Sequence, residues 1–160
     1  MRMQNFARLL QFRRFAAHEA KDDLISLRIR QYLPMAADLD FADCLILDII
    51  DRQSGNTAGE ISLRIGESES LYYLGHIGYH VDPPYRGSHY ALRACRLCLP
   101  LLREIGMRSV VITTDEDNAP SIRTCEELGC CLESTVDVPG WCVEKYQISR
   151  RKRIYVLVLT

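Results

Sequence analysis

Short runs of alternating apolar and polar positions dominate the first half of the chain, whereas helical spacing dominates the second half. β-Branched and other apolar residues at 24–30, 44–51 and 58–65 predict three strands. Residues 54–56, a Ser-Gly-Asn sequence, predict the turn between the last two strands. Between the first two strands, residues 31–43 leave room for one short helix at most.

A fourth strand is predicted at residues 71–81, and a long helix follows it. Gly75 and Gly78 interrupt this strand, and interior glycines mark a bulge or a close approach of another backbone. Residues 88–105 place apolar side chains on one helical face, and Gly106 ends that helix. The connection between strand and helix is therefore short, which makes its composition informative.

The remaining elements alternate between strand and helix. The β-branched run at 109–114 predicts a buried strand, and an acidic turn follows it. Pro120 suits the first turn of another helix, which Gly129 caps at its C-terminus. A loop is expected at 134–150 and a last strand at 154–159, so the whole pattern predicts an α/β domain.

The N-terminal segment differs in composition from the rest of the chain. Residues 1–20 contain four arginines and no acidic residue before Glu19, with apolar side chains between them. This composition predicts an amphipathic helix, and we interpret residues 1–23 as a helical extension of a domain at 24–160. A docking helix or an oligomer arm is the preferred role, while a mitochondrial transit peptide shares the composition.

Composition narrows the classes of function. The 160 residues are enough for one domain, and 48% of them are hydrophobic, as in an ordinary globular protein. A net charge of -1 argues against general nucleic-acid or membrane binding, and the basic residues 150–153 are expected in a solvated loop. The seven cysteines are odd in number and lack metal-binding spacing, so we expect reduced thiols in a cytoplasmic protein without a metal site.

The connection before the long helix carries the clearest chemical signal. Pro83 and Pro84 end the strand, and Gly87 permits a sharp turn. The backbone amides of residues 87–91 then point outward at a helix start, where the helix dipole also favours negative charge. Arg86 adds a fixed positive charge, so the segment predicts a phosphate-binding site.

This segment resembles the pyrophosphate-binding signature of the GNAT superfamily of N-acetyltransferases, which reads Arg or Gln, two residues, Gly, one residue, then Gly or Ala. Arg86 and Ala91 occupy the two ends of the signature, and Gly87 belongs to its usual lead-in. His89 stands where the signature has its middle glycine, which is a departure from the family pattern. The resemblance implies that the loop binds the pyrophosphate of acetyl-CoA.

A second segment resembles another motif of the same family. Asn118, Ser121 and a helix that closes in Glu-Glu-Leu-Gly at residues 126–129 match it. In the family this asparagine contacts the pantetheine arm or the helix start, and the resemblance implies that role for Asn118, with Ser121 as its neighbour. A simple helix cap is the alternative interpretation of Asn118.

One position of this motif departs from the family. Many members place a tyrosine seven residues after the asparagine, where it protonates the departing coenzyme A thiolate, and here that residue is Cys125. A thiol with an ordinary pKa of about 8.5 can supply the same proton, and so can water. A small buried residue that faces the sheet is the alternative interpretation of Cys125.

The resemblance implies an α/β (α+β) fold with a mixed, centrally splayed β-sheet of about six to seven strands flanked by helices. A bulge in the central strand exposes backbone groups that bind pantetheine and polarise the thioester carbonyl, and these groups belong here to Tyr79, His80 and Val81. The implied cofactor-binding residues are Tyr79, His80, Val81, Arg86, Gly87, Ser88, His89, Tyr90, Ala91, Asn118 and Ser121.

The implied catalytic residues are Tyr79, His80 and Cys125. The identity of the general base stays open among Tyr79, His80, His76 and Glu60. His80 is the preferred base, because imidazole is a common proton acceptor, and Tyr79 is expected to form a wall of the site.

The implied activity is acetyl-CoA-dependent transfer of an acetyl group to a primary amine, of a small molecule or of a protein or peptide N-terminus. The amine attacks the thioester directly while the strand amide near Val81 holds the oxyanion, and no acyl-cysteine forms. Because residues 31–43 are few, the acceptor site is expected to be open. Otherwise the acceptor site is completed by the N-terminal helix, by the 134–150 loop with Trp141, or by the second subunit of a homodimer.

Two other interpretations stay open. A GNAT-fold module that binds coenzyme A without turnover, as a sensor or assembly subunit, would accommodate the departures at His89 and Cys125. The turn at Arg86 would also suit another phosphate ligand, such as a nucleotide.

Overall fold

The computed structural model describes residues 2–40 and 42–160, and in this part of the chain seven strands form two sheets. The first sheet has the order β1-β2-β3-β4, with β1 (Ile25–Ala36), β2 (Ala42–Asp51), β3 (Thr57–Ile65) and β4 (Ile77–Val81). The second has the order β5-β7-β6, with β5 (Ser109–Thr114), β6 (Cys131–Asp137) and β7 (Arg151–Val158). All pairs within each sheet are antiparallel.

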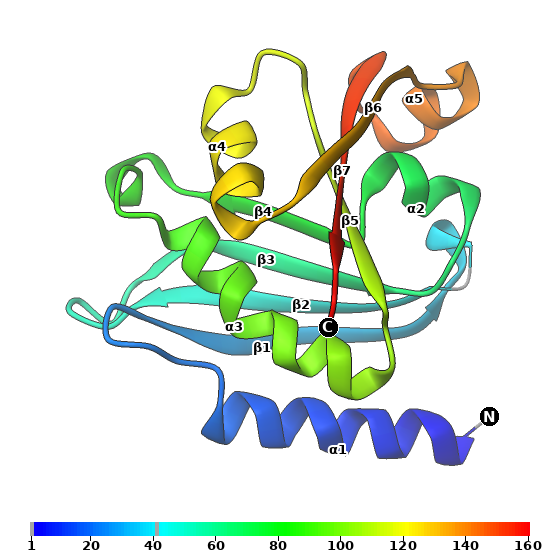
Figure 1. The fold of residues 1–160 in the computed structure, drawn as a ribbon. Helices are drawn as coiled ribbons and strands as arrows, with labels where there is room; N and C mark the ends of the chain where they lie inside the picture. Colours follow the sequence, from blue (N-terminus) through cyan, green and yellow to red (C-terminus); the bar gives the residue numbers. More distant parts are fainter. Residues whose placement is uncertain (1, 41) are drawn as a thin grey trace.

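Helices flank these sheets (Figure 1). The helices are α1 (Arg2–His18), α2 (Glu69–Leu74), α3 (Tyr90–Ile105), α4 (Ala119–Leu128) and α5 (Gly140–Tyr146), with 3-10 turns η1 (Ala37–Leu39) and η2 (Pro83–Tyr85). Helix α3 packs on the first sheet, and α1 lies beside β1 and α3. None of the described helices has both the length and the apolar character that crossing a bilayer requires.

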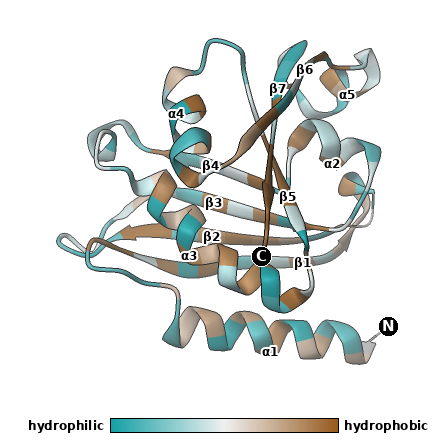
Figure 2. Cartoon of the chain, in the orientation of Figure 1, coloured by the Kyte–Doolittle hydropathy of each residue, from teal (hydrophilic) through white to brown (hydrophobic). Residues whose placement is uncertain are grey.

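One hydrophobic core joins α1, α3 and both sheets. Helix α3 presents small residues to the sheet, with Ala94 and Cys98 fully buried, so its backbone packs closely. Phe12 and Phe15 of α1 are at most 1% exposed and belong to the same core. Figure 2 shows hydrophobic stretches on β2 and β7 that contribute to it. The N-terminal helix therefore packs within its own chain.

Two hydrogen bonds between His76 and Val111 join the two sheets, which then diverge. The backbone amide of His76 donates to Val111 O at 2.7 Å, and the Val111 amide donates to His76 Nδ1 at 2.9 Å. Beyond this point no ladder joins β4 to β5 in the described residues, and Figure 1 shows the two strands running apart. The predicted α/β fold with a centrally splayed sheet and flanking helices is confirmed.

The prediction of one strand over residues 71–81 is wrong. Residues 69–74 form helix α2, because Ser68 caps it by accepting from the Leu71 amide at 3.2 Å and Gly75 ends it with φ 79°. The predicted bulge is also absent from β4, whose pairing with β3 is continuous. Gly75 instead permits close approach, since a Cβ there would lie 3.0 Å from Val111 O.

As expected, the segment 31–43 holds no more than one short helix, because β1 continues to Ala36 and only the turn η1 follows. Two later connections differ from expectation. The segment 134–150 is not a loop, since it contains the end of β6 and helix α5. The basic residues 150–153 do not form a solvated loop, because β7 begins at Arg151. Helix α3 begins at Tyr90, two residues later than predicted, because His89 adopts a left-handed conformation.

Candidate functional site

The turn before α3 has the geometry of an anion site. Gly87 and His89 both have positive φ, 90° and 59°, and α3 starts directly afterwards at Tyr90. The amides of residues 87–91 donate to no backbone or side-chain acceptor in the described part of the chain. Successive free amides in such a turn, together with the helix dipole, attract negative charge. His89 therefore adopts the backbone conformation for which the family signature uses glycine.

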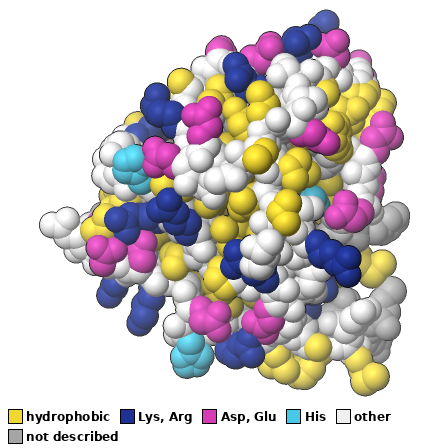
Figure 3. Space-filling view, viewed as in Figure 1, with side chains coloured by type: hydrophobic (Ala, Val, Ile, Leu, Met, Phe, Trp, Pro, Cys, Tyr) yellow, Lys and Arg dark blue, Asp and Glu magenta, His cyan; other side chains and the backbone are white. Residues whose placement is uncertain are grey.

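Arg86 lies at the open edge of this turn. Its Nε donates to Val81 O at 2.8 Å, which holds the guanidinium along the edge of β4. Figure 3 shows Lys and Arg side chains gathered over η2 and the start of α3, with acidic side chains beside them. The turn therefore combines free amides with a local positive charge.

A buried hydrogen bond anchors the turn to the first sheet. The Tyr90 hydroxyl donates to Asp51 Oδ1 at 2.5 Å, and both residues are at least nine-tenths buried. Asp51 also accepts from the Ser54 amide at 2.8 Å and from its hydroxyl at 2.6 Å. The hydrogen bond to Asp51, followed by burial, raises the pKa of Tyr90 to about 12. The first residue of α3 is thus fixed to the end of β2.

A cavity of about 460 Å³ opens between the end of β4, the turn and α4. Ten of the eleven predicted cofactor-binding residues line it, namely Tyr79, His80, Val81, Arg86, Gly87, His89, Tyr90, Ala91, Asn118 and Ser121. The eleventh predicted residue, Ser88, does not line this cavity, and neither does Cys125. Asn118 also caps α4, where its side chain accepts from the Ser121 amide at 3.2 Å.

Sequence reasoning missed five lining residues of this cavity. They are Tyr85, Pro120, Arg123, Thr124 and Glu127. The last four recur at helical spacing on α4, so a projection of that helix from Asn118 would have found them. Tyr85 stacks on Tyr90 with ring centroids 6.2 Å apart, a contact that no sequence period encodes.

Tyr79 forms the inner wall of the cavity. Its hydroxyl and Ser121 Oγ are 2.8 Å apart, which joins β4 to α4. Burial, with a smaller contribution from Cys125, raises the pKa of Tyr79, so the phenol keeps its proton. Cys125 itself is fully buried, and a hydrogen bond with Cys130 and burial raise its pKa. Of these two residues, Tyr79 is therefore the one that lines the cavity.

The backbone of β4 carries free polar groups on the edge that faces the gap between β4 and β5. The Asp82 amide donates to Ala58 O and His76 O accepts from the Arg64 amide, so even-numbered residues bond toward β3. Alternation then directs the backbone groups of Tyr79 and Val81 away from β3, toward the gap. The His80 carbonyl faces Gly59 on β3, so its backbone does not belong to this free edge.

A second cavity, of about 210 Å³, lies on the other side of Tyr79. Residues from β3, α2, β4, β5, the start of α4 and the start of β7 line it, among them Arg64, Thr114 and Lys152. Tyr79, Asn118 and Ser121 line both cavities. The two cavities therefore meet where β4 and β5 diverge. Sequence reasoning did not identify this cavity, apart from the three shared residues.

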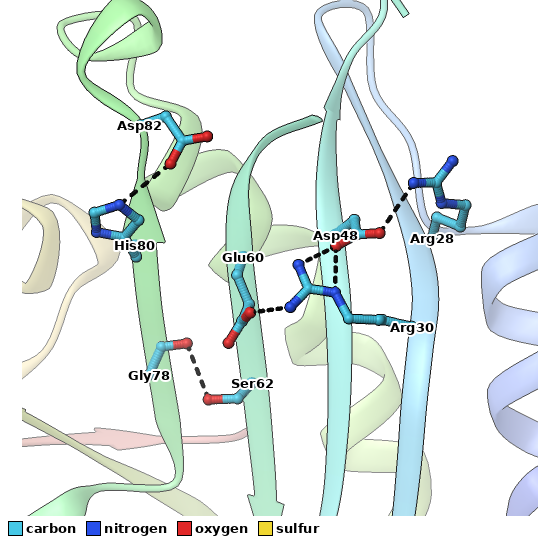
Figure 4. A network of polar contacts seen from close by, with 8 residues as sticks. All are labelled: Arg28, Arg30, Asp48, Glu60, Ser62, Gly78, His80 and Asp82. Atoms are coloured by element: carbon cyan, nitrogen blue, oxygen red, sulfur yellow. Dashed lines mark hydrogen bonds and ion pairs between the residues drawn. The ribbon is translucent and has the colours of Figure 1, made fainter. Parts of the chain in front are cut away.

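The proposed base residues have very different surroundings. His76 is 4% exposed, and Val111 and Gly66 occupy both of its ring nitrogens, so it has no free atom for a substrate. Glu60 pairs with Arg30, which also binds Asp48 (Figure 4). The exposed His80 places Nε2 3.2 Å from Asp82 Oδ1.

Solved structures with a similar fold are acetyltransferases. Microcin C7 self-immunity acetyltransferase MccE, in complex with acetyl-CoA and AMP, is 24% identical, with TM-score 0.57 over 72% of this chain and 61% of that one. Ribosomal-protein-S5-alanine acetyltransferase from Vibrio fischeri is 16% identical, with TM-score 0.57 over 72% and 62%. A GNAT-family acetyltransferase from Bacillus anthracis is 20% identical, with TM-score 0.55 over 71% and 65%.

The chain spans about three fifths of the length of these solved structures. No curated protein matches its sequence significantly. The family model described as an acetyltransferase (GNAT) domain matches residues 4–130, from α1 to the end of α4. Because that match covers most of the chain and the sheet has the expected central splay, the chain belongs to the GNAT acetyltransferase family.

Proposed function

We propose that the protein is an acetyl-CoA-dependent N-acetyltransferase in which a primary amine attacks the thioester directly. The observation that carries this proposal is the pair of cavities that meet at Tyr79. One cavity starts at free amides beside Arg86, which suits a pyrophosphate. The other opens on the far side of the splay, where an acceptor has room.

Acetyl-CoA supplies the activated acetyl group, and the described residues fit its chemistry. The free amides of residues 87–91 and Arg86 would hold the pyrophosphate. The unpaired edge of β4, together with Asn118 and Ser121, would hold the pantetheine arm, whose amides need partners of the kind that this edge leaves free.

The same residues account for stabilisation of developing charge. The backbone amides of Tyr79 and Val81 face the splay and can donate to the oxyanion as the amine attacks. The Tyr79 hydroxyl donates a hydrogen bond to the leaving thiolate, since its raised pKa keeps it protonated. Water completes the protonation. This assignment replaces Cys125, whose buried thiol lines neither cavity.

His80 is the proposed general base. Its imidazole is exposed, and Asp82 Oδ1 lies 3.2 Å from Nε2, in position to orient the ring. Gly78, two residues earlier on the same face of β4, lines the second cavity. An acceptor amine in that cavity therefore approaches the face that His80 occupies.

The acceptor is a small-molecule or peptide amine. Among the structural neighbours, one carries the name of a ribosomal-protein alanine acetyltransferase, which supports a peptide amine, and another binds AMP together with acetyl-CoA, which supports room for a small molecule in this fold. All seven cysteines are free, which fits a reducing cytoplasm. A catalytically inactive coenzyme A-binding module is the second candidate, because Cys125 is sequestered where many family members have a tyrosine.

Calorimetry tests the cofactor half of the proposal. We expect acetyl-CoA to bind the wild-type protein, and Arg86→Ala to weaken binding about 10- to 100-fold, because a charge-assisted hydrogen bond contributes about 1.5–3 kcal/mol. Arg103→Ala is the matched control, since Arg103 is an exposed arginine in the last turn of α3, outside both cavities. Equal affinity of all three proteins for acetyl-CoA would contradict the assignment of the pyrophosphate to the turn.

A further inference from the structure

The second cavity contains a guanidinium without a carboxylate partner. Arg64 on β3 is half-buried, and its Nη1 donates to Leu74 O at 3.1 Å and Gly75 O at 3.0 Å. Within residues 2–40 and 42–160, no acidic side chain forms an ion pair with Arg64. Burial lowers its pKa, so the surroundings resist the charge that it carries. A half-buried cation of this kind favours an anionic ligand.

The site is built around this guanidinium. Gly78 on β4 makes room for it, since a Cβ at that position would lie 3.1 Å from Arg64 Nη2. Glu60, on the same face of β3, is already paired with Arg30. Asp115 and Lys152 also line the cavity, but their charges neutralise each other across 2.6 Å. Arg64 therefore gives the cavity its net positive charge.

We propose that this cavity binds an anionic group of the acceptor, so that the substrate is a small primary amine that also carries a carboxylate or phosphate. The Arg64 guanidinium donates to the anionic oxygens, and the amine is directed toward Tyr79, where the cavities meet. The volume of about 210 Å³ suits a group the size of one amino acid. This inference rests on the proposed acetyltransferase activity, because it assigns the acceptor half of the same site.

The test compares acceptors that differ in charge alone. Amino acids are paired with their amides, phosphoethanolamine with ethanolamine, and tripeptides that begin with aspartate with those that begin with asparagine. Each compound is assayed in two ways: by amine-dependent release of coenzyme A from acetyl-CoA, and by the shift in melting temperature of the protein saturated with coenzyme A. We expect the anionic member of at least one pair to be preferred by about tenfold or more in both assays. The pair that shows the preference identifies whether the anionic group of the acceptor is a carboxylate, a phosphate or part of a peptide.

Two variants connect that preference to the cavity. Arg64→Gln keeps donors for the Leu74 and Gly75 carbonyls but removes the charge, so it should abolish the preference for the anion. Arg64→Lys keeps a positive charge and should retain part of the preference. Arg103→Gln, at an exposed arginine outside both cavities, is the matched control and should retain the full preference.

The outcomes separate this inference from the function on which it rests. If acetyl-CoA binds but no anionic compound shifts the melting temperature more than its neutral partner, the inference is wrong and the cofactor assignment stands. An anion preference that survives unchanged in Arg64→Gln also overturns it. If acetyl-CoA does not bind the wild-type protein, the proposed function fails instead.

Discussion

Adding one methyl group at Gly59 is expected to lower the free energy of unfolding by about 3 kcal/mol or more. The Cβ of Gly59→Ala would lie 2.1 Å from His80 O and 3.0 Å from Val81 Cα. Both obstructing groups are backbone, so no side-chain rotation relieves the clash, and β3 must separate from β4. Because β4 carries Tyr79 and Val81, the same substitution is expected to weaken acetyl-CoA binding.

Urea denaturation measures the first effect, with Gly140→Ala as the control. Gly140 begins helix α5, where an added Cβ meets no atom within 4 Å. The free energy of unfolding of Gly140→Ala should stay within about 0.5 kcal/mol of the wild-type value. If Gly59→Ala unfolds at the wild-type urea concentration, β4 does not lie against β3 as described.

His76→Gln is expected to lower the free energy of unfolding by about 3 kcal/mol at pH 7. His76 joins the two sheets, because Nδ1 accepts from the Val111 amide at 2.9 Å and Nε2 lies 3.1 Å from Gly66 O. This pattern places the proton on Nε2 and requires a neutral ring. Glutamine cannot span both partners from the same backbone position, so at least one buried backbone group loses its partner.

The same contacts predict a pH dependence. Burial lowers the pKa of His76 in the folded protein, whereas in the unfolded chain it titrates near its ordinary value of about 6.5. As the pH falls below about 6.5, the unfolded chain binds a proton that the folded protein does not, so stability decreases. The wild-type protein should therefore lose stability between pH 7 and pH 5, and His76→Gln should lose less.

The control for this slope is His18→Gln, which removes an exposed histidine at the end of α1. The free energy of unfolding of His18→Gln at pH 7 should stay within about 0.5 kcal/mol of the wild-type value. Asp48 and Asp115 also have lowered pKa values, but their contribution to the free energy of unfolding is lost only at a lower pH, below about 4. A wild-type slope that persists unchanged in His76→Gln would contradict the neutral clamp between the sheets.

The anion turn was predictable because its chemistry is local. Two prolines, a glycine, an arginine and the helix start lie within about ten residues, and each acts on its immediate backbone. Ten of the eleven predicted cofactor-binding residues therefore line one cavity. The conformation of His89 was not predictable in the same way, since φ 59° is uncommon for a residue other than glycine.

Helix α2 was predicted as a strand because its short sequence fits both the period of a helix and the period of a strand. Residues 69–74 are mostly apolar or aromatic, and such a short run does not distinguish a strand from a helix. Two contacts decide the outcome, namely the Ser68 cap and the close approach of Gly75 to β5. The second depends on a strand that lies more than thirty residues further along the chain, which no local pattern reveals.

The second cavity depends even more strongly on tertiary structure. Arg64 and Thr114 come from strands in different sheets, and only the splay brings them to one cavity. His76 was considered as a base because of its residue type, but Gly66 and Val111 occupy both of its nitrogens. Residue chemistry can be read from the sequence, whereas the partners that assign a role come from the fold.

The most direct measurement of the central claim is the release of coenzyme A from acetyl-CoA by the wild-type protein, with and without a panel of primary amines, with mass spectrometry of the amine. We expect thiol release that requires both the protein and an amine, together with an equal amount of acetylated amine. Tight binding of acetyl-CoA without amine-dependent release across the panel would contradict it, and would identify the protein as a module that binds coenzyme A without turnover.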